Sequence, residues 1–147
     1  MQPIVSPSLL SADFLHLADD VEMINRSEAD WLHIDVMDGV FVPNLSFGFP
    51  ILEAIRPICK KPLDVHLMIV EPMKFVDRLA ELGVYMMNVH YEASPHLHRS
   101  LAAIRKAGCI TIIQICYCLT YSIDIYISNT SNSSVCLYKL HNIHYDL

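Results

Sequence analysis

The feature that most constrains the fold is a regular alternation, over the first 108 residues, of short apolar runs with longer amphipathic stretches. Short runs rich in Val, Ile, Leu or Met are typical of strands buried on both faces, and their alternation with helices is typical of a parallel sheet. The sequence therefore predicts an α/β fold. The expected strands are Ile4–Leu10, Trp31–Met37, Leu63–Ile69 and Tyr85–Tyr91, with a fifth at Ile110–Cys116.

Helices are expected between these strands because capping and breaking residues mark their ends. Proline stands in the first turn of three of them, where its missing N–H costs little, and Gly83 and Gly108 follow two of them as C-caps. The expected helices are Asp13–Asn25, Phe49–Ile58, Pro72–Leu82 and Pro95–Ala107.

Repeated βα units build either an open doubly wound sheet or a closed (β/α)8 barrel of the TIM type. The open nucleotide-binding sheet needs a glycine-rich turn, and neither G-x-G-x-x-G nor G-x-x-x-x-G-K-[ST] occurs. Polar residues instead lie within the strands and at their carboxyl ends, where barrel enzymes place their sites. We therefore expect a barrel. Because such a barrel takes about 250 residues, we expect this chain to be truncated to about its first half.

The composition changes at Gly108. Residues 109–147 contain no Pro, Gly, Met, Phe or Glu, but hold four of the five Cys and five of the seven Tyr. We expect two parts, an N-terminal half-barrel over 1–108 and an atypical C-terminal segment over 109–147. Two interpretations of the second part stay open: a β-rich extension, since apolar and polar residues alternate over 123–127, or an aberrant translation product.

Composition and charge exclude several classes of protein. The 53% of hydrophobic residues is enough for a core, which argues against a disordered chain. The net charge of −6, without clusters of Lys or Arg, argues against nucleic-acid binding. The sequence has no apolar run of about 18 residues and no basic segment before an apolar one, so we expect no membrane span, no secretory signal and a cytoplasmic protein.

Two neighbouring strands carry most of the candidate chemistry. Side chains alternate between the faces of a strand, so in WLHIDVMDG the residues His33, Asp35 and Met37 share one face. In LDVHLMI the same rule puts three residues together: Asp64, His66 and Met68. All six are expected to point into one interior.

His33, Asp35 and His66 suit one divalent transition metal ion, Zn²⁺, Fe²⁺, Mn²⁺ or Co²⁺. A single buried His is more often a hydrogen-bonded core residue, but three polar groups in an apolar interior are costly unless they satisfy one another or a metal. A metal beside a carboxylate suits proton abstraction next to a carbonyl, with Asp35 as the base. The residues alone therefore predict metal-assisted enolisation.

Other positions leave two interpretations open. Ser8 can bond a substrate hydroxyl or simply cap a turn. Met37 and Met68 can fill the core or form an apolar wall over a reactive intermediate. His90, which shares a strand face with Asn88, is either a site residue or a core residue.

Four motifs together resemble the ribulose-phosphate 3-epimerase family over about residues 3–108. They are SPSLLSADF at Ser6–Phe14, HIDVMDGVFVPNLSFG at His33–Gly48, DVHLMI at Asp64–Ile69 and VHYEA at Val89–Ala93. The resemblance implies a (β/α)8 barrel and a small phosphosugar substrate. The implied reaction interconverts D-ribulose 5-phosphate and D-xylulose 5-phosphate in the pentose phosphate pathway.

The resemblance also implies roles for individual residues. Asp35 would be a metal ligand and one of two catalytic acid/base carboxylates. The second catalytic Asp and the glycine-rich phosphate loops belong to late strands of the family's barrel, and residues 109–147 offer no counterpart. The other implied roles are metal ligation by His33 and His66, substrate contact by Ser8 and His66, and shielding of the enediolate by Met37 and Met68.

Two alternatives to this function follow from the same features. The chain would be a catalytically inactive half-barrel or interaction protein if the missing carboxylate is essential. Its open strand edges would then favour pairing with another copy as a homo-oligomer. A related phosphosugar epimerase, such as an allulose-6-phosphate 3-epimerase, shares the early motifs.

Overall fold

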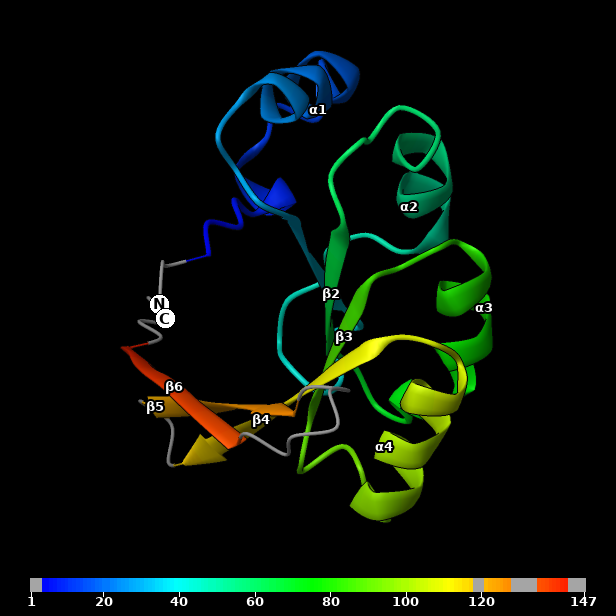
Figure 1. Cartoon of the computed structure of the whole chain (residues 1–147), viewed down its shortest axis with the longest axis vertical. Coiled ribbons are helices and arrows are strands. Elements are labelled where there is room, and N and C mark those ends of the chain that lie inside the picture. Colours follow the sequence, from blue (N-terminus) through cyan, green and yellow to red (C-terminus); the bar gives the residue numbers. More distant parts are fainter. Residues whose placement is uncertain (1–3, 118–120, 128–134, 143–147) are drawn as a thin grey trace.

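The computed structural model describes the backbone of residues 4–117, 121–127 and 135–142 and the side chains of residues 4–115. Six strands form one sheet in the order of the chain (Figure 1). They are β1 (Leu32–Met37), β2 (Leu63–Met68), β3 (Met86–His90), β4 (Ile110–Tyr117), β5 (Tyr121–Ile127) and β6 (Val135–Asn142).

Strands β1 to β4 are all parallel, and each pairs with the strand before it. Helices α2, α3 and α4 lie along the same face of this part of the sheet (Figure 1). A doubly wound sheet reverses its strand order and places helices on both faces, whereas a barrel adds each strand beside the last. The four parallel strands and their helices are therefore a partial (β/α)8 barrel, as the sequence predicts. The helices are α1 (Leu17–Arg26), α2 (Phe49–Ile55), α3 (Val76–Glu81) and α4 (Leu97–Lys106), with 3₁₀ turns η1 (Leu9–Ser11) and η2 (Pro72–Phe75).

The pairing direction changes after β4. β4 begins just after Gly108 and pairs with β3 in parallel, but β5 and β6 are antiparallel to their neighbours. The strand expected at Ile110–Cys116 is confirmed, and the alternation around residues 123–127 lies in β5. The change of composition at Gly108 thus precedes the change of strand direction by one strand.

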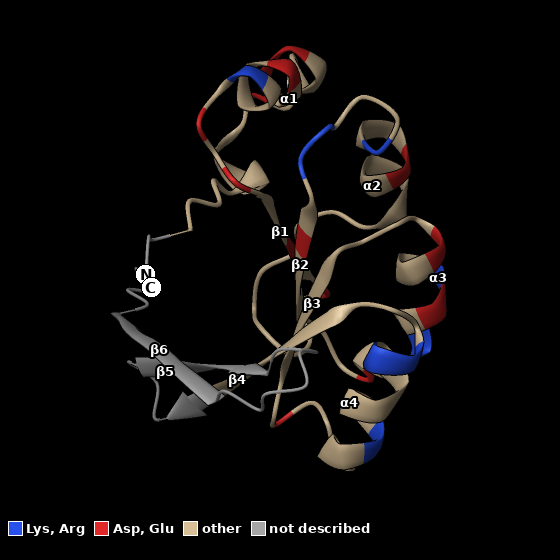
Figure 2. Cartoon of the chain, in the orientation of Figure 1, with Lys and Arg blue, Asp and Glu red and all other residues tan. Residues whose placement is uncertain are grey.

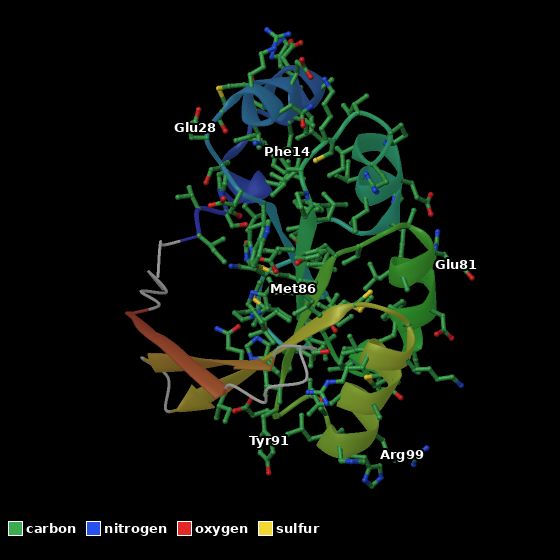
Figure 3. The ribbon with its side chains drawn as sticks, in the orientation of Figure 1. Phe14, Glu28, Glu81, Met86, Tyr91 and Arg99 are labelled. Atoms are coloured by element: carbon green, nitrogen blue, oxygen red, sulfur yellow. The ribbon has the colours of Figure 1, made fainter. Side chains whose placement is uncertain are left out.

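The hydrophobic core lies between the sheet and its helices. Alternate residues of β1, Leu32 and Ile34, are buried against this layer, together with Leu52 of α2 and Ile104 of α4. Many of the charged residues lie on the helices (Figure 2). In Figure 3, Met86 lies at the centre of the molecule, whereas Glu81 and Arg99 point outward. The polar residues of β1 and β2, among them His33, Asp35 and His66, lie on the opposite face of the sheet.

The expected strand at Ile4–Leu10 is wrong. Only Ser8 forms a bridge with His33, and η1 follows immediately. The segment still runs beside β1, since the N–H groups of Asp30 and His33 donate to the carbonyls of Val5 and Pro7. Pro7 has no N–H to give to a ladder, which weakens a strand here.

The first helix begins at Leu17 rather than at Asp13. The Asp13 carboxylate accepts a hydrogen bond from the Leu15 N–H at 2.9 Å and contacts His16 Nδ1 at 2.9 Å. An Asp side chain that bonds the backbone two residues ahead favours a turn over a helix. The first helical turn is therefore replaced by a local Asp turn. Among the described residues, every helix is too short or too polar to cross a lipid bilayer.

Candidate metal centre

The register of β1 and β2 brings the predicted ligands together. Asp35 is paired with His66, and His33 with Asp64, across two parallel neighbouring strands. Side chains at paired positions lie on the same face of a sheet, a few ångströms apart. The alternation within each strand and the register between them thus converge on one cluster, which consists of His33, Asp35 and His66.

Asp35 lies at the centre of this cluster. Its Oδ1 atom is 3.0 Å from Nε2 of His33 and 3.0 Å from Nδ1 of His66. Its Oδ2 atom accepts a hydrogen bond from Ser8 Oγ at 2.9 Å. One carboxylate therefore receives two imidazole nitrogens and a hydroxyl from three separate segments.

Burial and charge shift the protonation of these groups. Burial alone would lower the pKa of His33, but hydrogen bonds to Asp35 and Asp64 and the charges of both carboxylates raise it to about 10. Burial would raise the pKa of Asp35, but hydrogen bonds from His33 and His66 hold it far below its usual range. Asp35 is therefore ionised at neutral pH.

The cluster fits a divalent transition metal ion. One ligand atom from each of His33, Asp35 and His66 lies within 4.8 Å of the other two. Two imidazoles and a carboxylate are donors that Zn²⁺ and Fe²⁺ accept, and three protein ligands leave a position open for substrate. The residues that the sequence singled out are thus those that the structure gathers.

The structure also places the other predicted site residues. Ser8 reaches the cluster through its bond to Asp35, and Leu10 N–H donates to the same hydroxyl at 3.3 Å. Met37 and Met68 are register partners at the carboxyl ends of β1 and β2. They lie on the same strand faces as the ligands, two residues further along each strand.

The sequence alone did not assign a definite role to two neighbours of the cluster, Asp64 and His90. Asp64 Oδ2 lies 2.6 Å from Nδ1 of His33, and His90 Nε2 lies 2.8 Å from Nε2 of His66. Burial and the nearby His66 lower the pKa of His90 to about 3. Strand alternation put both residues on the correct face, but only the strand register shows what they touch.

An apolar cavity of about 450 Å³ is distinct from this cluster. It is lined by residues of β1, β2, α2, η2 and α3 and of the loops between them, among them Phe47, Phe49 and Phe75, but by none of the three candidate ligands. Met37, at the end of β1, also lines this cavity.

Comparison with known proteins decides the family. A sequence model of the ribulose-phosphate 3 epimerase family matches residues 4–128, which is most of the chain. The chain belongs to this family. The matched segment extends past Gly108 and includes β4 and all of β5.

Curated proteins of the ribulose-phosphate 3-epimerase family are similar over a shorter stretch. The ribulose-phosphate 3-epimerase of Synechocystis is 54% identical over 107 residues, covering 71% of this chain and 46% of that protein. The Bacillus subtilis protein of the same name is 49% identical over 104 residues, covering 71% of this chain and 48% of the relative. The chloroplastic ribulose-5-phosphate-3-epimerase of Arabidopsis thaliana is 46% identical over 107 residues, covering 71% and 38%. The chain spans about half the length of these relatives.

Proposed function

We propose that this chain supplies the metal-binding half of an active site that epimerises D-ribulose 5-phosphate to D-xylulose 5-phosphate at C3. One observation carries the proposal: the Asp35 carboxylate contacts two imidazoles from neighbouring strands, His33 and His66, at 3.0 Å. Membership of the epimerase family supports the choice of substrate. His33, Asp35 and His66 would hold one Zn²⁺, Fe²⁺, Mn²⁺ or Co²⁺ ion.

Asp35 is the proposed catalytic base. Its carboxylate is ionised at neutral pH, which is the state that accepts a proton from C3 of the sugar. The C–H electron pair then moves toward C2, and the C2 carbonyl oxygen becomes an enediolate oxygen. A bound divalent cation would supply positive charge to the sugar oxygens. Epimerisation is complete when a second acid returns a proton to the other face of C3, and by the family resemblance that acid would belong to a late barrel strand.

The neighbouring residues take supporting roles in this proposal. Ser8 would bond a substrate hydroxyl, since its Oγ already lies within hydrogen-bond distance of the proposed base. His66 would contact substrate as well as metal. Met37 and Met68 would cover the enediolate and exclude water, since they end the two strands that carry the ligands.

Three further expectations belong to the same proposal. The chemistry would reside in residues 1–108, with 109–147 as a separate segment. The protein would be cytoplasmic. It would form a homo-oligomer through strand edges and bind neither nucleic acid nor membrane.

The test follows exchange at C3 directly. The chain is incubated in D₂O with D-ribulose 5-phosphate and added Zn²⁺ or Fe²⁺, and proton NMR records the loss of the C3 proton and the appearance of D-xylulose 5-phosphate. We expect exchange that depends on the metal, because Asp35 alone can remove and return a proton on one face. Formation of the epimer tests whether the second acid is also present.

The outcomes separate the candidate functions. Neither exchange nor epimer, with metal bound, would favour an inactive half-barrel or interaction protein. Faster turnover of D-allulose 6-phosphate than of D-ribulose 5-phosphate would favour the related epimerase. Turnover that survives Asp35→Asn would show that this cluster is not the site.

A further inference from the structure

Each histidine of the cluster uses both of its ring nitrogens. His33 directs Nε2 to Asp35 and Nδ1 to Oδ2 of Asp64, at 3.0 and 2.6 Å. His66 directs Nδ1 to Asp35 and Nε2 to Nε2 of His90, at 3.0 and 2.8 Å. The two rings thus have an inner nitrogen facing the carboxylate and an outer nitrogen facing a second residue.

We propose that Asp64 and His90 are positioning residues that make His33 bind the metal through Nε2 and His66 through Nδ1. This inference rests on the metal centre of the proposed function. It concerns the outer partners of the ligands, which touch neither metal nor substrate.

Asp64 would hold the proton of metal-bound His33 on Nδ1. Both ring nitrogens of His33 face carboxylates, which only accept hydrogen bonds, so when Nε2 ligates a metal beside Asp35 the remaining ring proton is on Nδ1, where Asp64 accepts it. Asp64 is only 7% exposed, and it is the register partner of His33 on the adjacent strand. The backbone pairing of β1 and β2 therefore fixes the distance between the two side chains.

Asp64 also has an unused acceptor. Its Oδ1 atom is buried and has no hydrogen-bond partner among the described residues. A buried carboxylate oxygen without a partner is costly. A purely structural role does not account for a buried Asp at position 64. Its 2.6 Å contact with Nδ1 of His33 does account for it.

His90 does the same for His66 from the other side. The two Nε2 atoms are 2.8 Å apart, so one nitrogen must donate a proton and the other must accept it. When Nδ1 of His66 gives its lone pair to a metal, the single ring proton is on Nε2, and Nε2 of His90 is the acceptor. His90 is 3% exposed and its ring packs against Phe41, with centroids 4.8 Å apart, which fixes its orientation.

Outer partners of this kind have a measurable effect. Hydrogen bonds to the second nitrogen of a ligating histidine fix its orientation, and their loss costs about 10- to 100-fold in metal affinity. The variants Asp64→Leu and His90→Leu remove the acceptor at similar volume. Asp64→Asn and His90→Gln keep an amide oxygen that accepts from the same nitrogen, and should recover part of the affinity.

The first measurement is the affinity for Zn²⁺, by competition with a coloured chelator. We expect losses of about 10- to 100-fold for each Leu variant and smaller losses for the amide variants. Thr111→Val is the matched control, because Thr111 is fully buried on β4 and its hydroxyl has no partner among the described residues. This control should bind Zn²⁺ as the wild type does.

The second measurement reads the ring nitrogens by ¹⁵N NMR of histidine in the Zn²⁺-loaded wild-type protein. We expect a protonated Nδ1 and a metal-bound Nε2 for His33, and the reverse for His66. The spectrum needs no variant, so it decides the inference even if the Leu variants fail to fold.

These measurements distinguish a failure of this inference from a failure of the proposed function. A wild-type protein that binds none of Zn²⁺, Fe²⁺, Mn²⁺ or Co²⁺ would overturn the metal centre and this inference with it. If the wild type binds Zn²⁺ tightly but all four variants bind it equally well, only the positioning roles are overturned. The same holds if the NMR spectrum shows the opposite ring nitrogens bound to the metal.

Discussion

Nδ1 of His66 lies 3.0 Å from Oδ1 of Asp35, although the two residues are 31 positions apart in the sequence. The contact arises because β1 and β2 are parallel neighbours and these two residues are register partners. A helix and its connections separate the strands along the chain. The geometry of the proposed site therefore depends on the whole βαβ unit.

Replacement of Asp35 by Asn is the most direct test of the proposed base. The amide cannot accept the C3 proton, and it is a poorer metal ligand than a carboxylate. We expect C3 exchange to fall by about 10²- to 10⁴-fold, the usual contribution of a general base. Proton NMR in D₂O gives the rates, and Glu81→Gln on α3 is the control because Glu81 points into solvent (Figure 3). Equal rates in the two variants would contradict the role of Asp35.

Asp38 makes the loop after β1 sensitive to acid. Its carboxylate accepts hydrogen bonds from the N–H groups of Val40, Phe41 and Val70, at 2.8, 2.9 and 2.8 Å. Burial is the largest single effect and opposes ionisation, but the backbone hydrogen bonds together outweigh it and lower the pKa of Asp38 below its ordinary value of 3.8. A group with a lowered folded pKa stabilises the fold above its unfolded pKa, and the contribution is lost as the pH falls through the folded value.

We therefore expect Asp38→Ala to cost about 1 kcal/mol in the free energy of unfolding at pH 6, through lost hydrogen bonds. The difference from wild type should shrink as the pH falls below 3.8. Urea unfolding at a series of pH values gives both numbers. A difference that stays constant down to pH 2 would show that the ionised carboxylate is not what stabilises the loop.

Two cysteines should be unreactive in the folded protein. Cys59 and Cys109 are buried and free, and burial raises the pKa of both thiols. Each thiol also faces a backbone carbonyl, that of Lys61 or Val84. Because the thiolate is the nucleophile, we expect alkylation by iodoacetamide at pH 8 to be more than about tenfold slower than in guanidine. Peptide mapping follows each cysteine separately, and fast labelling of either one in the native protein would contradict its burial.

Gly108 has a backbone conformation that other residues rarely adopt. Its φ is +87°, yet a Cβ atom there would meet nothing within 4 Å, so a substitution reports backbone strain alone. We expect Gly108→Ala to destabilise the fold by about 1 kcal/mol. Asn adopts positive φ more readily than Ala, so Gly108→Asn is the matched control and should cost less stability than Gly108→Ala. Equal urea midpoints for the two variants would contradict the prediction.

Much of the fold could be predicted because its signals are local. The apolar runs that became β1 to β4 and the proline and glycine signals around the helices each act within a few residues. The errors are local as well. The turn formed by Asp13 delays α1, and Pro7 weakens the first strand, because specific side chain and backbone chemistry overrode the general pattern.

The site was predictable only in part, for a different reason. Strand alternation suffices to place His33 and Asp35 on one face, because it needs no knowledge of the partner strand. The contacts of Asp64 and His90 depend on strand register, which no single strand encodes. Sequence reasoning therefore found the proposed ligands and placed Asp64 and His90 on strand faces, but could not show what these two residues contact.

Both hydrogen-bonding edges of β4 are occupied, one by β3 and the other by β5. Along the β5 edge, the paired residues run from Thr111 with Ile127 to Tyr117 with Tyr121. A (β/α)8 barrel would add its next parallel strand at that second edge. A further βα unit, whether from the same polypeptide or a different one, must therefore compete with β5 for the same backbone groups. Completion of the barrel would be an exchange reaction, in which an antiparallel neighbour dissociates before a parallel one can bind.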